Sequence, residues 1–152
     1  MMSEWIEPFE ISNRINLYLL NAIAPGSLNA QAGGKGRTVG EQFAHMHNVR
    51  LMWLNAAAPD LAAKVEKIEK EADKKLLEKA LKVSGEVIVE LLNKAGGPGG
   101  KVKNFKPHAA GFVGYLVAHD AHHRGQIALT LKLAGAPLDK KIGFGMWEWG
   151  SR

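Results

Sequence analysis

Apolar residues recur at spacings of three and four positions along most of this chain, and this periodicity restricts its fold more than any other feature. One such stripe consists of Ile11, Ile15, Tyr18, Leu19 and Ile23, and another of Leu77, Leu81, Ile88 and Leu91. Val, Ile and Thr never alternate with polar residues over the length of a strand. The pattern therefore predicts an all-α fold.

Four long helices are expected, over residues 8–24, 39–55, 69–94 and 107–135, with a short helix possible after the break at residues 58–60. Thr38 and Glu41 have the spacing of a capping box, in which each side chain binds a free backbone amide at a helix start. Glycine and proline stretches separate the helices. Four main helices predict a four-helix bundle.

The composition favours one globular domain over residues 1–152. Hydrophobic residues make up 46% and charged residues 23% of the 152 residues, which excludes disordered and collagen-like chains. The chain has no cysteine, so disulfides, thiolate nucleophiles and cysteine-based metal sites are excluded. A metal site would need histidine or carboxylate ligands.

Charge and hydropathy indicate a cytoplasmic protein that binds neither membrane nor nucleic acid. The first residues are acidic where a signal peptide would be basic, and no apolar run approaches the roughly 18 residues of a membrane helix. The net charge is +5, but the densest basic stretch, residues 64–82, mixes lysines with acids. Such a stretch is typical of a solvated helix face rather than of a nucleic-acid interface.

Five of the six histidines fall in two short stretches, residues 44–48 and 118–126, and each stretch lies inside an expected helix. His119 and His123 are about 40° apart around the helix and about 6 Å apart along it, so both imidazoles can reach one ion. A third histidine from a neighbouring helix would complete a site with open coordination positions. That geometry is typical of catalytic rather than structural metals.

The third ligand is not determined by periodicity. His45 and His47 are about 200° apart around their helix, so at most one of them can face the site. Both have apolar neighbours on their own side of the helix. The helical pattern leaves either residue possible.

Three segments resemble the DinB-like (DinB/YfiT) metalloenzyme superfamily: residues 38–50 (TVGEQFAHMHNVR), 115–127 (YLVAHDAHHRGQI) and 145–149 (GMWEW). The most specific element is the motif His-x-x-x-His-Arg-Gly-Gln, here residues 119–126. The resemblance implies a four-helix bundle, a homodimer, and one divalent nickel, zinc or iron ion held by three histidines. It also implies that His45 is the third ligand, beside His119 and His123.

The resemblance further implies a reaction on a small-molecule substrate. Characterised members include transferases and isomerases that depend on small-molecule thiols, in which the metal lowers the pKa of the bound thiol. A metal in an open site can activate water or a thiol, as in a hydrolase or a transferase. The alternative is a non-catalytic metal-binding or stress-associated protein, in which the ion only stabilises the bundle.

Other polar residues near the histidines are candidates for supporting roles. Gln126 is the first candidate to hydrogen-bond a histidine ligand or a metal-bound water, and Glu41 and Tyr115 are weaker ones. Glu41 already has a role in the capping box. Asp120 and Arg124 stand four residues apart, which favours an ion pair along the helix.

Overall fold

The computed structural model describes residues 3–152, and every regular element in that range is helical. The elements are α1 (Glu7–Ala22), η1 (Pro25–Asn29), α2 (Val39–Ala57), α3 (Pro59–Ala62), α4 (Lys74–Lys94), α5 (Ala109–Leu133), α6 (Lys140–Gly145) and η2 (Trp149–Ser151), where η denotes a 3-10 helix. The four expected long helices are therefore present. Among residues 3–152, no helix combines the length and the apolar character that a membrane span requires.

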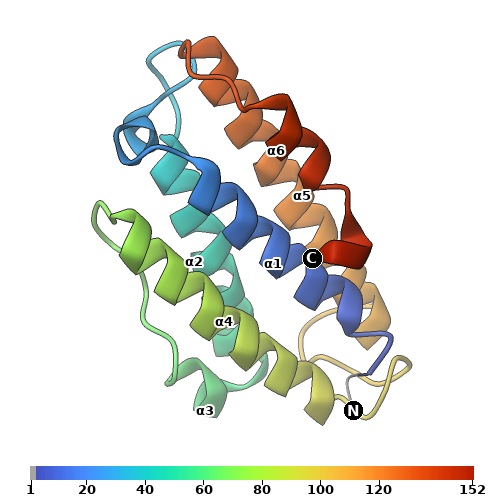
Figure 1. Cartoon of the computed structure of the whole chain (residues 1–152). Helices are drawn as coiled ribbons and strands as arrows, with labels where there is room; N and C mark the ends of the chain where they lie inside the picture. The colour runs from blue at the N-terminus through green and yellow to red at the C-terminus, as the bar shows by residue number, and fades with distance from the viewer. Residues whose placement is uncertain (1–2) are drawn as a thin grey trace.

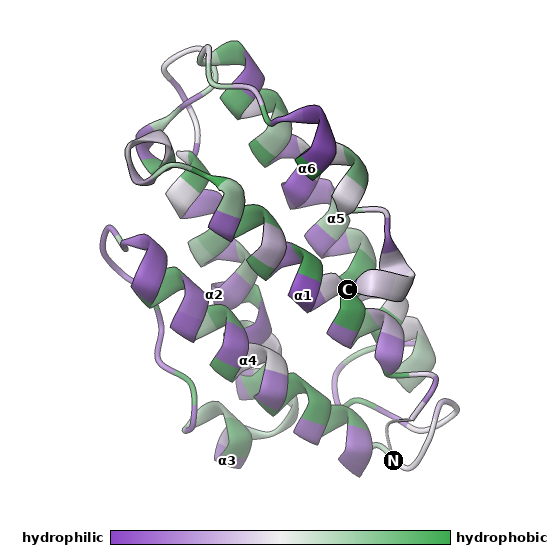
Figure 2. Ribbon diagram, in the orientation of Figure 1, coloured by the Kyte–Doolittle hydropathy of each residue, from purple (hydrophilic) through white to green (hydrophobic). Residues whose placement is uncertain are grey.

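The four long helices form the bundle that the sequence predicts (Figure 1). Each packs against two others: α1 and α2 both contact α4 and α5. The short α3 lies against α2 and α4 at one end of the bundle. Figure 2 shows the amphipathic character of the long helices, most clearly in α4, where hydrophilic and hydrophobic residues occupy different sides. This pattern explains why the helices associate, because each buries its apolar side against its neighbours.

The core consists of two apolar clusters. Phe9, Leu54, Ile88 and Phe112 belong to the first, and Leu19, Phe43, Leu77 and Ile127 to the second. On each long helix, one or more buried polar residues lie between the two clusters. We call this group the polar layer: Ser12, Asn13, Asn16, Arg50, Ser84 and Asp120.

Asp120 is the anionic centre of the polar layer. Its Oδ2 accepts hydrogen bonds from Ser12 Oγ and Asn16 Nδ2, each at 3.0 Å, and from Arg50 Nη2 at 3.3 Å. Arg124 does not pair with Asp120 along the helix, contrary to the expectation from their spacing. Its Nη1 donates instead to Asn16 Oδ1 and Ser12 Oγ on α1. The burial of these residues between helices explains the difference, because buried polar groups must find partners across the bundle.

Two helix starts differ from the sequence expectation by two residues or more. α4 begins at Lys74 rather than at residue 69, because Asp73 caps it by accepting a hydrogen bond from Leu76 N at 2.8 Å. The residues before α4 are not helical, because a side chain on α2 binds their backbone. Asn48 donates a hydrogen bond to Ile68 O through Nδ2 and accepts one from Ile68 N through Oδ1. α5 begins at Ala109, two residues after residue 107, with His108 as its N-cap.

Candidate metal centre

Three histidines from two helices converge at one edge of the bundle. His45 comes from α2, and His119 and His123 come from successive turns of α5. One ring nitrogen from each lies within 4.8 Å of the other two. The ring centroids are 4.6 Å apart for His45 and His123, 4.5 Å for His119 and His123, and 5.3 Å for His45 and His119. The fold therefore brings together two segments that are more than 70 residues apart in the sequence.

The donor set fits a divalent transition metal. The Nε2 atoms of His119 and His123 are 3.2 Å apart. Two nitrogens at about 2.1 Å from a tetrahedral ion would be roughly 3.4 Å apart, so the observed spacing needs little adjustment. Within residues 3–152, the cluster contains neither aspartate nor glutamate. The ligands would therefore be three neutral imidazoles.

His123 is oriented by a residue that the sequence analysis did not single out. Its Nδ1 lies 2.6 Å from Oε1 of Gln42, which is in the first turn of α2, and both side chains are buried. An amide oxygen only accepts hydrogen bonds, so Nδ1 carries the proton and donates it. The position of Gln42, three residues before His45 on the same helix, is the signal that could have identified it.

Burial keeps the clustered histidines neutral. It is the main cause that lowers the pKa of His45, His119 and His123, and the neighbouring positive charges act in the same direction. The pKa of His123 falls from 6.5 to about 4. Arg37 contributes to the lowering for both His45 and His123. Neutral imidazole is the form that binds metals, so protons compete little for these nitrogens at neutral pH.

His47, the alternative to His45, lies away from the cluster. Its ring is buried, with Nδ1 at 3.0 Å from the carbonyl oxygen of Ala80 and Nε2 at 2.7 Å from that of Glu66. Both ring nitrogens therefore contact backbone groups. His47 thus links α2 to α4 and to the segment that precedes α4. Neither of its ring nitrogens is available to bind an ion.

The three supporting candidates differ in their surroundings. Glu41 forms the expected capping box, with its Oε2 accepting from Thr38 N at 2.7 Å. Gln126 is exposed, and a hydrogen bond between its side chain and His123 raises the pKa of that histidine slightly, against the lowering by burial. Tyr115 stacks on His119 with ring centroids 6.2 Å apart, and its hydroxyl accepts from Trp53 Nε1 at 3.2 Å. Tyr115 thus belongs to an aromatic cluster adjoining the site.

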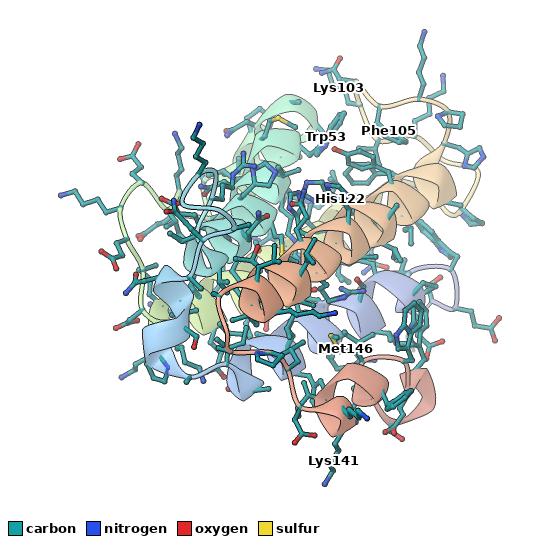
Figure 3. All side chains as sticks on the ribbon, turned by 90° about the horizontal axis from the view of Figure 1, so that it is seen from above. Trp53, Lys103, Phe105, His122, Lys141 and Met146 are labelled. Carbon is teal, nitrogen blue, oxygen red and sulfur yellow. The ribbon has the colours of Figure 1, made fainter. Side chains whose placement is uncertain are left out.

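The site lies where α2 and α5 run side by side. Figure 3 shows Trp53 and Phe105 together at one end of this contact, with His122 labelled further along α5. Trp53 and Phe105 pack edge to face at 5.4 Å. His45 also lines a cavity of about 880 Å³, together with residues that include Arg37 and Asn48. A small molecule therefore has space beside the cluster.

The low pKa of His123 predicts that acid destabilises the metal-free protein. The unfolded chain takes up a proton on this residue below pH 6.5, whereas the folded protein does so only near pH 4. Its contribution to the free energy of unfolding is therefore complete above about pH 6.5 and is lost as the pH falls to about 4. Urea unfolding of metal-free protein across this range should show the loss.

The matched variants for this prediction are His123→Gln and His122→Gln. The first removes the buried imidazole and should reduce the dependence of unfolding free energy on pH. The second removes an exposed imidazole from the adjacent position, and we expect it to leave most of the dependence in place. The prediction would be contradicted if the unfolding free energies of wild type and His123→Gln depended on pH to the same extent.

Comparison with known protein families gives one match. The family model described as "DinB family" matches residues 2–140, which is most of the chain. Neither the curated proteins nor the solved structures contain a match to this sequence.

Proposed function

The chain belongs to the DinB family, and we propose that it binds one divalent metal ion through His45, His119 and His123. The observation that carries this proposal is the convergence of three imidazole nitrogens within 4.8 Å of one another. Gln42 and burial keep His123 neutral and oriented for such a role. Imidazole ligands suit nickel, zinc and iron, the three ions we propose as candidates.

We propose further that the protein is an enzyme acting on small molecules, a thiol-dependent transferase or isomerase. Three protein ligands leave coordination positions open, and an ion bound there would supply Lewis acidity for a thiol or water. Three neutral ligands leave the charge of the ion uncompensated, which favours an anionic further ligand such as a thiolate. Because the chain has no cysteine, the thiol must come from another molecule, and we propose a small one.

The surroundings of the cluster support a small substrate. The cavity beside His45 has a volume of about 880 Å³, which is within the range of small-molecule sites. Tyr115 stacks on His119, and Trp53 packs against Tyr115, so aromatic surface adjoins the cluster. The residues of this chain would thus position the substrate and limit the access of water.

The first test is the metal content of protein purified without a histidine tag or chelator. We expect about one equivalent of nickel, zinc or iron per chain by elemental analysis, or after reconstitution with each ion separately. A protein that binds none of the three ions would contradict the proposal.

The second test concerns the reaction. Metal-loaded protein is incubated with a panel of small thiols and electrophilic acceptors, and thiol consumption is compared with that of metal-free protein. Thiol consumption that depends on the metal would support the proposed enzymatic function. One bound equivalent without any turnover would favour the alternative, a metal-binding protein in which the ion only stabilises the bundle.

A further inference from the structure

We propose that Gln42 is a positioning residue, which holds His123 in the tautomer whose Nε2 lone pair is free to bind a metal ion. This inference rests on the proposed metal-binding function. It assigns a role to a residue that lies outside the three-histidine cluster and outside the motif in α5.

A neutral imidazole has one N–H group and one nitrogen lone pair. In His123 the two nitrogens face different partners: Nδ1 lies 2.6 Å from Gln42 Oε1, and Nε2 lies 3.2 Å from His119 Nε2. Because the amide oxygen accepts, the proton is held on Nδ1. The lone pair is then on Nε2, the nitrogen that faces the cluster.

The contact between Gln42 and His123 is shielded from water. Gln42 is 7% exposed and His123 is 5% exposed. The backbone of Gln42 is fixed in the first turn of α2, where its N–H donates to Thr38 O at 2.9 Å. Loss of the acceptor would therefore leave a buried N–H without a partner, which is costly. The surroundings thus favour one tautomer strongly.

The other two histidines lack such a partner. Within residues 3–152, neither His45 nor His119 has a hydrogen bond from its ring to a group outside the cluster. His123 is therefore the ligand whose orientation the protein fixes most firmly. A neutral amide does so without adding a negative charge near the ion, as a carboxylate would.

The test measures the tautomer in the metal-free protein and the affinity for metal separately. Nitrogen-15 NMR of labelled histidine, near neutral pH, should show His123 protonated on Nδ1 in wild type. Gln42→Leu removes the acceptor and should allow a mixture of tautomers, whereas Gln42→Glu restores an acceptor and should restore the Nδ1–H form. The affinity for nickel or zinc should fall about 10- to 100-fold in Gln42→Leu and recover substantially in Gln42→Glu.

The matched control is Asn93→Leu, which replaces an exposed side-chain amide on α4 with the same residue. We expect its metal affinity and the tautomer of His123 to match wild type. Circular dichroism checks that each variant folds, and if Gln42→Leu does not fold, Gln42→Ala replaces it.

Two results would overturn the inference: His123 of wild type protonated on Nε2, or a folded Gln42→Leu that keeps both the wild-type tautomer and the wild-type metal affinity. The NMR measurement needs no metal. Its wild-type result decides the tautomer even where no variant folds. If wild type binds no ion while the tautomer depends on Gln42, the proposed function fails, and only the hydrogen bond between Gln42 and His123 is established.

Discussion

His123→Ala is expected to abolish stoichiometric metal binding. The substitution removes one of the three proposed ligands. Only His45 and His119, whose ring centroids are 5.3 Å apart, would remain to bind the ion. Structural zinc sites derive about 10–16 kcal/mol from a full ligand set, so the loss of one ligand should weaken affinity by at least about 100-fold. Elemental analysis and competition with a chromophoric chelator measure this directly.

Three other histidine variants make this prediction specific. His45→Ala should also lose the ion. His122→Ala should retain it, because His122 is exposed and lies outside the cluster although its ring is 5.0 Å from that of His123. His47→Ala should retain the ion but unfold more easily, because both ring nitrogens contact backbone carbonyls. Full metal content in His123→Ala would refute the assigned ligand set.

Asp120→Ala is expected to cost about 3–5 kcal/mol of unfolding free energy, the largest stability effect that we predict. The carboxylate is the partner of Arg50, whose side chain is 1% exposed, at 3.3 Å. Ser12 and Asn16 also donate to the same oxygen. The substitution leaves a buried guanidinium without its anion and two donors without their acceptor.

Urea unfolding of the metal-free protein measures this cost. The matched control is Glu90→Ala, which breaks the exposed ion pair with Lys64 at 2.7 Å and should change stability by less than about 1 kcal/mol. A second variant, Arg50→Met combined with Asp120→Ala, should recover part of the loss, since it removes the buried charge as well. A cost below about 1 kcal/mol in Asp120→Ala would show that the ion pair is not important for stability.

The helices were predictable because their signals are local. Apolar periodicity located the four long helices, and the capping box located the start of α2 at Val39. The start of α4 was missed, since residues 63–73 take their path from contacts with His47 and Asn48 on α2. The sequence of that segment contains no local pattern from which contacts with a distant helix could be predicted.

The candidate site was predictable in part. The four-residue spacing of His119 and His123 placed both on one face of α5, and the structure shows their rings adjacent. The choice between His45 and His47 needed information from other helices: the sides of α2 that face α5 and α4 are both largely apolar. Gln42 was missed for a related reason, because its role depends on His123, 81 residues away.

The positions of Arg50 and Asp120 have a consequence for the kinetics of the proposed metal uptake. Arg50 lies five residues after His45 on α2, and Asp120 follows His119 on α5. Their buried ion pair joins the two helices and opposes a shift of one helix along the other. The separation of the histidines is thus set when the chain folds, rather than by the ion. Uptake should then follow a single bimolecular step, with a rate proportional to metal concentration and without a slow rearrangement phase.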